Sequence, residues 1–345
     1  MDELTAFLLD VFALGGAGGG DGSARLSFVA RGAEGQVSLL ETDGRRYAVK
    51  RPFAVDAGFP DLTSGEEVVR REAGHLAHFA QAGIPVPLPV ADREGRFLVP
   101  VPAELGGGVV RVNAWVDGAA PRADFVPGLH ATELGTLLGR LHAAAPPTDD
   151  PIGWWYRSVP EPQVWADLVS RGTDQPWHEA LSARVADLDG LGDLVRAGPA
   201  PTGPLVVGHR DLHPENVLVT SDGQLVPVDW EDVGPVLPDR ELAKVLVQWH
   251  VDGEEVDASA VRRTVIAYRA AGGTGAVHGL EAFTMLLSGE LNFLARQAGA
   301  SLDPATEETH RRHAVAEVQE CLLWLPSPST LQHVLDVVLD LMAAG

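Results

Sequence analysis

The residues best suited to chemistry in this 345-residue chain lie between Gly208 and Trp230. Asp211 follows His209 by two residues, and Asn216 comes five residues after Asp211. A second aspartate, Asp229, ends an apolar run. A carboxylate that can receive a proton, together with an amide oxygen and a carboxylate that can hold Mg²⁺, suits transfer of a phosphoryl group from ATP.

The segment after Asn216 predicts a β-hairpin that would position these groups. Residues 217–219 are typical of a strand, Asp222-Gly223 of a tight turn, and residues 225–228 of the return strand. We therefore expect Asn216 and Asp229 at the same end of the hairpin.

Two other interpretations of this segment remain open. His209 could be an ordinary core histidine, or His209, Asp211 and His213 could form a metal cluster in a hydrolase. The hydrolase interpretation offers no role for Asn216 or Asp229.

An upstream segment is suited to binding nucleotide phosphates. Gly32, Gly35 and Val37 match the kinase loop G-x-G-x-x-G-x-V, although Ala30 replaces its first glycine. Glycine allows backbone N–H groups to approach phosphate closely. A predicted hairpin then leads to Lys50. Its side chain should point to the opposite face of the strand from that of Tyr47, where it can bind phosphates. The alternative is a solvated lysine on an edge strand.

The next predicted helix, residues 64–82, should supply the carboxylate partner that a kinase lysine needs. Glu72 is favoured because Leu76 and Phe79 lie four and seven residues later on the same inward stripe. The helix should stop at Gly83.

Taken in order, these motifs resemble the aminoglycoside phosphotransferase family, the small-molecule branch of the protein-kinase-like fold. The resemblance covers residues 28–243. The matching pieces are Gly32-x-x-Gly35-x-Val37, Ala48-Val49-Lys50, Arg71-Glu72-Ala73, residues 82–87, residues 134–142, residues 209–216 and Val228-Asp229-Trp230.

The resemblance implies an α+β, bilobal fold with a small β-rich N-lobe and a larger, mainly helical C-lobe. It implies that Asp211 is the catalytic base and Lys50 a phosphate ligand with Glu72 as its partner. It also implies that Asn216 and Asp229 hold Mg²⁺. The expected parts are residues 1–24, a helix and glycine-rich connector; 25–115, the nucleotide lobe; and 116–345, the catalytic lobe with an insertion at 151–204.

The segment that joins the lobes should bind adenine through main-chain atoms, which makes Asn113 and Trp115 candidates. The acceptor should be a small molecule, because only eleven residues separate Asp229 from Glu241. Protein kinases carry a long activation segment there. We therefore expect no protein substrate.

Composition further limits the classes of molecule that the protein is expected to bind. The net charge of −22 argues against nucleic acid and favours a cationic acceptor, although acidic surfaces also serve solubility. We find neither an apolar run long enough to cross a membrane nor an export signal. The single cysteine, Cys321, fits a reducing cytoplasm.

The chain after residue 250 is expected to be helical, and it supplies most of the acceptor candidates. Glu317, Glu320 and Trp324 share one predicted helix face that could bind an amine and a ring. Glu290 and Glu231 are further candidates. A solvated acidic stripe is the alternative.

The sequence therefore predicts transfer of the γ-phosphate of ATP, with GTP not excluded, to a hydroxyl of a cationic aminoglycoside or amino sugar, as in antibiotic modification. One alternative is a metabolic kinase for glucosamine, a choline-like alcohol, a nucleoside or homoserine. Another is a non-catalytic nucleotide-binding module. The segment Gly15–Gly22 is expected to be a connector or a lid.

Overall fold

The structure is a computed structural model that describes residues 1–14, 24–32, 35–53, 61–121, 128–198 and 203–343. The connector or lid expected at Gly15–Gly22 lies outside these ranges. The chain forms two compact units, and the first contains residues 1–119 and 218–231. The second contains residues 120–217 and 232–345. Residues 218–231 thus group with the N-terminal segment although they follow 98 residues of the second unit.

The first unit is built on a five-stranded antiparallel sheet with the strand order β1-β2-β3-β5-β4. Its strands are β1 (Arg25–Arg31), β2 (Gly35–Thr42), β3 (Arg45–Pro52), β4 (Val99–Pro100) and β5 (Val109–Ala114). Because β3 lies between β2 and β5, Lys50 has Val37 on one side and Arg111 on the other. Lys50 is therefore in an inner strand, not on a sheet edge.

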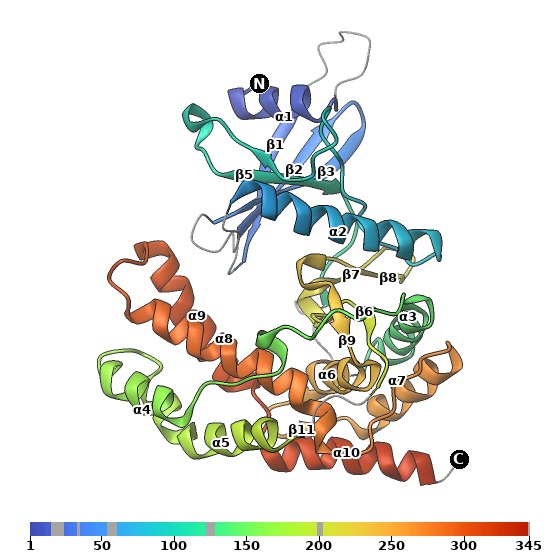
Figure 1. Ribbon diagram of the computed structural model, residues 1–345, viewed down its shortest axis with the longest axis vertical. Helices are drawn as coiled ribbons and strands as arrows, with labels where there is room; N and C mark the ends of the chain where they lie inside the picture. The colour runs from blue at the N-terminus through green and yellow to red at the C-terminus, as the bar shows by residue number, and fades with distance from the viewer. Residues whose placement is uncertain (15–23, 33–34, 54–60, 122–127, 199–202, 344–345) are drawn as a thin grey trace. The chain divides into compact units, whose positions relative to one another are not determined.

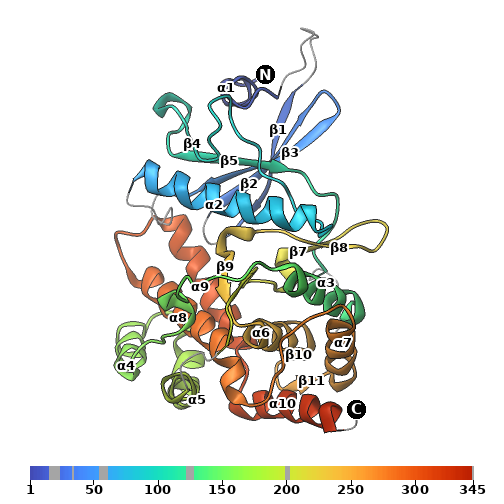
Figure 2. The ribbon, with the colours of Figure 1, turned by 45° about the vertical axis from the view of Figure 1, so that its right-hand side comes forward.

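The two faces of this sheet carry different helices (Figure 1). Tyr47 and Val49 point to the face where α1 (Glu3–Val11) packs, and they are buried in one core with Leu8 and Phe12. The other face carries α2 (Leu62–Gln81), as Figure 2 also shows. This confirms the predicted alternation of the β3 side chains between the two faces of the sheet.

Helix α2 begins at Leu62, two residues before the expected start, and ends before the predicted stop at Gly83. The Asp61 side chain caps it by accepting a hydrogen bond from the Ser64 amide at 2.9 Å. The helix ends before Gly83, which has a φ of 75°. Its buried stripe includes Glu72, Leu76 and Phe79, as expected.

A short hairpin completes the first unit. Strands β7 (Val217–Val219) and β8 (Leu225–Pro227) pair with each other, which confirms the predicted hairpin. Trp230 follows it and is almost fully buried, with its ring centroid 5.3 Å from that of Phe79 in α2. This contact anchors the residues on either side of Trp230 to α2.

The second unit is mainly helical. Its helices are α3 (Ala131–Ala144), α4 (Pro162–Arg171), α5 (His178–Ala197), α6 (Pro238–His250), α7 (Ala258–Ala270), α8 (Thr284–Leu302), α9 (Glu308–Trp324) and α10 (Pro328–Ala343). Helix α3 packs on α7, and α8 packs on α9, α5 and α6. The chain after residue 250 is mainly helical, as expected, and a 3₁₀ turn, Leu280–Phe283, leads into α8.

Short strands complete the second unit. Strand β6 (Val206–Gly208) pairs with β9 (Gly234–Val236), and β10 (Val251–Asp252) pairs with β11 (Glu255–Val256). The segment after β6 leads directly into the residues expected to do chemistry. Among the described residues, no helix has the length and apolarity needed to cross a bilayer.

Candidate active site

Lys50 is the centre of a partly buried charge network in the first unit. Its Nζ lies 2.9 Å from Oδ1 of Asp229 and 2.8 Å from Oε2 of Glu231. Burial disfavours the charged amine, but the two carboxylates outweigh this effect and raise the pKa of Lys50. Lys50 is therefore held as a cation at neutral pH.

Glu72 belongs to the same network but does not pair with Lys50. Its Oε1 accepts a hydrogen bond from Nη2 of Arg111. Nη1 of Arg111 donates to Oε1 of Glu231 at 2.6 Å. The direct Lys50–Glu72 pair expected from the sequence is replaced by the path Lys50–Glu231–Arg111–Glu72. These four residues and Asp229 are here called the Lys50 network.

Asp229 and Glu231 reach Lys50 because of the backbone around Trp230. A 3₁₀ turn spans Trp230–Asp232, and Asp229 adopts a φ of 58° that is uncommon for a residue with a side chain. Nε1 of Trp230 donates to the carbonyl of Pro227 at 2.9 Å. The buried indole thus fixes a turn that directs carboxylates on both of its sides to one amine.

The glycine-rich segment is described on both sides of Ala33 and Glu34. The Gly32 amide donates to the Gly35 carbonyl at 2.9 Å. A Cβ on Gly35 would lie 2.7 Å from the Arg51 carbonyl oxygen, so the close approach of β2 and β3 requires glycine here. Val37 lies opposite Lys50, as the predicted hairpin requires.

The two adenine-binding candidates lie at the end of β5 and just beyond it. Nδ2 of Asn113 donates to the Pro87 carbonyl at 3.1 Å. The Trp115 amide donates to the Arg46 carbonyl at 3.2 Å. Their expected main-chain contacts with adenine remain a prediction.

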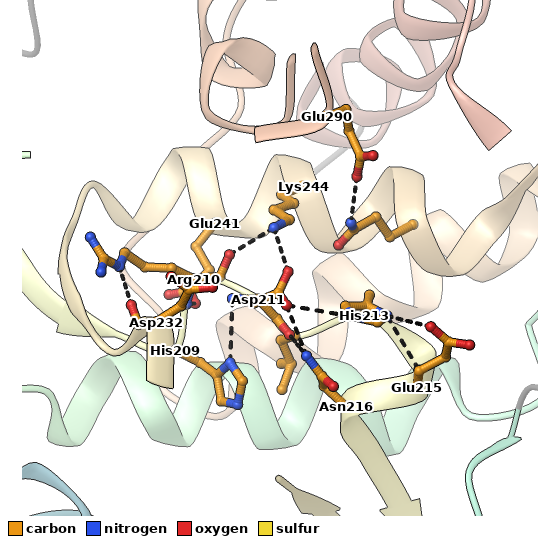
Figure 3. A network of polar contacts seen from close by, with 12 residues as sticks. His209, Arg210, Asp211, His213, Glu215, Asn216, Asp232, Glu241, Lys244 and Glu290 are labelled. Carbon is orange, nitrogen blue, oxygen red and sulfur yellow. Dashed lines mark hydrogen bonds and ion pairs between the residues drawn. The ribbon is translucent and has the colours of Figure 1, made fainter. Parts of the chain in front are cut away.

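In the second unit, Asp211 lies in the loop of residues 209–213, here called the Asp211 loop, and side chains from this loop, from the 3₁₀ turn Pro214–Asn216 and from α6 converge on its carboxylate (Figure 3). Oδ1 accepts a hydrogen bond from Nζ of Lys244 at 2.9 Å, and Oδ2 accepts one from Nδ2 of Asn216 at 2.8 Å. Nε2 of His213 lies 3.4 Å from Oδ2. Burial opposes ionisation, but Lys244 and His213 outweigh it and hold the pKa of Asp211 well below its usual range.

The orientation of Asn216 bears on whether this loop could help hold a metal ion. Its Nδ2 also donates to the backbone carbonyl of Asp211 at 3.1 Å, which turns the amide oxygen away from Asp211. An amide oxygen and a carboxylate such as Asp229, whose side chain is 43% exposed, are hard donors that fit Mg²⁺. Within the described residues, no group of three or more His, Cys, Asp or Glu side chains could hold a metal.

Helix α6 supplies the groups that hold the Asp211 loop. The backbone of Arg210 has a φ of 67°, and both of its polar groups are bonded. The Arg210 amide donates to Oε1 of Glu241, and its carbonyl accepts from Nζ of Lys244 at 2.8 Å. Nε1 of Trp249 donates to the Leu212 carbonyl at 2.8 Å.

Glu241 is itself fixed by a buried chain of hydrogen bonds. Its Oε2 lies 2.8 Å from Nε2 of His142, whose Nδ1 lies 2.7 Å from the hydroxyl of Tyr268. A Cβ on Gly208 would lie 2.1 Å from Oε2 of Glu241, so glycine makes room for this carboxylate. Through these contacts Glu241 fixes the backbone at Arg210, next to Asp211.

Lys244 and Arg111 are site residues that the sequence motifs do not identify. A signal for Lys244 exists, because it lies three residues after Glu241 on a helix whose neighbouring residues are apolar and buried. A cation on such a stripe needs a buried anion. The pairing of Arg111 depends on β5 lying beside β3, which local sequence does not specify.

The acceptor candidates occupy two different places. Glu290 on α8 accepts from Nε2 of Gln248 at 3.0 Å, and its Oε2 lies 3.8 Å from Sγ of Cys321. On α9, Glu317 pairs with His313 at 2.9 Å, Glu320 is half-buried and Trp324 is 42% exposed. Glu231, in contrast, belongs to the Lys50 network of the first unit.

The model of the phosphotransferase enzyme family matches residues 25–280 of this chain. The chain belongs to this family. This confirms the resemblance inferred from the motifs, and the small antiparallel sheet and the helical second unit confirm the predicted fold class.

Two curated homoserine kinases are among the proteins to which this chain is similar. That of Cupriavidus necator is 31% identical over 156 residues, which are 43% of this chain and 42% of that protein. That of Rhodopseudomonas palustris is 31% identical over 208 residues, 56% of this chain and 54% of the relative. The chain thus matches about half the length of these curated relatives.

Solved structures extend the likeness of fold to nearly the whole chain. An amicoumacin kinase in complex with AMP-PNP, Ca²⁺ and Ami has a TM-score of 0.60 at 17% identity, covering 97% of each chain. A spectinomycin phosphotransferase in complex with ADP and spectinomycin also has a TM-score of 0.60, at 15% identity, covering 98% of this chain and 97% of that one.

Proposed function

We propose that this protein transfers the γ-phosphate of ATP to a hydroxyl group of a small, amine-bearing acceptor. The observation that supports this most strongly is the Asp211 carboxylate, which is kept ionised by Lys244 and oriented by Asn216. An ionised carboxylate can accept a hydrogen bond from a substrate hydroxyl and receive its proton as the phosphoryl group moves.

The other site residues take the following roles in this proposal. Lys50 binds the phosphates of the nucleotide, whose negative charge it partly neutralises. Asn216 and Asp229 supply the protein oxygens that hold Mg²⁺, and the bound ion neutralises charge on the phosphates. Gly32, Gly35 and Val37 shape the segment that covers the nucleotide. Asp211 needs only to orient the hydroxyl and hold its proton.

An acceptor with an amine and several hydroxyls, such as an aminoglycoside or amino sugar, is our first candidate. The net charge of −22 favours cations, and Glu290, Glu317 and Glu320 are carboxylates on α8 and α9 that could bind them. Trp324, which is partly exposed on α9, could pack against a ring. The two structural neighbours described above are named as kinases of amicoumacin and spectinomycin.

A second acceptor, homoserine, is supported by a separate observation. The curated relatives at 31% identity are named homoserine kinases. Homoserine is also a small molecule that carries an amine and a hydroxyl. The two candidates differ in net charge, because homoserine is zwitterionic whereas an aminoglycoside is a polycation.

A screen of acceptor-dependent ADP release tests the proposal. Wild type and Asp211→Asn are assayed with Mg·ATP against aminoglycosides, amino sugars, homoserine and small amino alcohols. We expect release above the acceptor-free rate for at least one class, and strong loss in Asp211→Asn. If Mg·ATP binds but no acceptor stimulates release across the panel, the chain is a nucleotide-binding module and the proposal fails.

A further inference from the structure

Two cations face each other across neighbouring strands in the first unit. Lys50 of β3 and Arg111 of β5 are direct antiparallel partners. Their side chains are only 19% and 7% exposed. Like charges at opposite positions of a sheet repel, and burial makes the repulsion stronger. This pair therefore depends on the carboxylates placed around it.

Glu231 is the carboxylate that the two cations share. Its Oε2 lies 2.8 Å from Lys50, and its Oε1 lies 2.6 Å from Arg111. The second terminal nitrogen of Arg111 bonds Glu72, so one guanidinium joins two carboxylates. A planar guanidinium presents separate N–H groups in a fixed fork, which the single ammonium group of lysine cannot match.

Arg111 also controls the charge that Lys50 experiences. The Lys50 network contains two cations, Lys50 and Arg111, and three carboxylates. Without Arg111, the buried carboxylate of Glu72 would lose its partner, and Lys50 alone would face all three acids. An unpaired buried carboxylate is costly, and it would compete for the lysine that the nucleotide needs.

We propose that Arg111 is a positioning residue for nucleotide binding, through which Glu72 acts on Lys50 by way of Glu231. Arg111 binds Glu72 and thereby leaves the Lys50 amine directed to Asp229 and Glu231. This role replaces the acceptor contact that the sequence suggested for Glu231. The inference rests on the proposed function, because it treats Lys50 as the phosphate ligand.

Titration of Mg·ATP without acceptor into four forms of the full chain tests this role. The forms are wild type, Arg111→Met, Glu72→Gln and the double variant. Arg111→Met should weaken ATP binding roughly tenfold, because one more uncompensated negative charge lies near the triphosphate. Glu72→Gln should weaken binding a few-fold in the otherwise wild-type protein. Arg111 then draws Glu231 away, and the Lys50 amine loses one of the two carboxylates that direct it.

The decisive comparison is the effect of Glu72→Gln in the Arg111→Met background. There it should strengthen ATP binding, because it removes the carboxylate that lost its partner. A direct Lys50–Glu72 pair would give the opposite sign, with Glu72→Gln weakening binding in both backgrounds. That result, or an unchanged ATP affinity in Arg111→Met, overturns the proposal.

Two further variants separate positioning from general damage. Arg96 of the first unit pairs with Asp92 and Glu94, so Arg96→Met removes the same charge and a similar number of ion pairs. It should leave ATP affinity within about twofold, because Arg96, whose side chain is 38% exposed, pairs with no residue of the Lys50 network. Arg111→Lys should recover part of the affinity, and the KM for the acceptor should stay unchanged in all Arg111 variants.

Thermal unfolding without nucleotide distinguishes failure of this inference from failure of the proposed function. Glu72→Gln should lower the Tm by roughly 3 °C in wild type and raise it in Arg111→Met. If wild type binds no ATP but the effect of Glu72→Gln on Tm still reverses sign, the proposed function is wrong, whereas the described role of Arg111 in the Lys50 network is supported. If wild type binds ATP and neither ATP affinity nor Tm reverses sign, the network role falls alone.

Discussion

The two units hold their charged residues in different ways. In the first unit, the five side chains of the Lys50 network bond one another. In the second unit, Glu241, Lys244 and Trp249 bond the backbone of Arg210 and Leu212. The first arrangement fixes a distribution of charge, whereas the second fixes the conformation of a loop.

This difference predicts two kinds of response to substitution. A lost charge in the Lys50 network can be compensated by removing an opposite charge, as proposed for Arg111 and Glu72. A lost contact in the Asp211 loop leaves a backbone amide or carbonyl without its partner, and no second side-chain change restores it. The predictions below test this contrast, from the largest expected effect to the smallest.

Asp211→Ala removes the group to which the whole loop is directed. Turnover should fall by about 10² to 10⁴, the usual contribution of a positioned acid or base. The affinity for ATP should change little, because the Asp211 carboxylate bonds Lys244, Asn216 and His213 and no member of the Lys50 network. Acceptor-dependent ADP release and ATP titration measure the two effects, and near-normal turnover would contradict the role of Asp211.

Glu241→Gln tests whether Glu241 supports turnover by holding the backbone of the Asp211 loop in place. Loss of the charged bonds to the Arg210 amide and to His142 should lower kcat by about 10-fold to 100-fold. Glu179, an exposed glutamate in the first turn of α5, provides the matched control Glu179→Gln. An equal loss in both variants, or a loss confined to ATP affinity, would sink this explanation.

His250 at the end of α6 predicts a pH dependence of stability. Burial lowers the pKa of His250 from 6.5 to about 4, and its Nε2 lies 2.7 Å from the Thr264 hydroxyl. Because the unfolded chain binds this proton more readily, the contribution of His250 to stability should be lost as the pH drops from 6.5 to about 4, with no further loss from this group below that. The loss should reach about 3 kcal/mol.

Denaturant unfolding at several pH values checks this prediction against His250→Gln, which cannot titrate. The free energy of unfolding of the variant should depend less on pH over this window, by about the same amount. Identical pH profiles for the two proteins would show that His250 is not the titrating group.

Gly35→Ala should have the smallest effect, and it concerns the sheet rather than the charge network. The added Cβ would meet the Arg51 carbonyl at 2.7 Å, whereas a Cβ on Gly32 meets no described atom within 4 Å. We expect Gly35→Ala to lower the Tm by roughly 3 °C and Gly32→Ala by less than about 1 °C. Equal Tm values for the two variants would contradict the close contact between β2 and β3.

Much of the framework could be predicted because local patterns specify it. The alternation of Tyr47, Val49 and Lys50 follows from the strand period, and the inward position of Glu72 follows from helical spacing. Turn residues specified the hairpin of β7 and β8. These features need no knowledge of which elements become neighbours.

The partners of the charged residues could not be predicted in the same way. Glu72 was expected to bond Lys50, but the neighbouring strand β5 brings Arg111 to it instead. Lys244 reaches Asp211 from a helix that begins 27 residues later in the chain. A side chain of this length can bond any acid within reach, so its choice depends on the tertiary fold.

Phosphorus NMR of the reaction with Mg·ATP tests the central claim most directly, because it detects the transferred group. With an acceptor selected in the ADP-release screen, a new phosphate-ester resonance should grow in step with ADP, and Asp211→Ala should slow both by about 10² to 10⁴. ADP that accumulates with free phosphate and no ester, or an equal ester yield from Asp211→Ala, would contradict it.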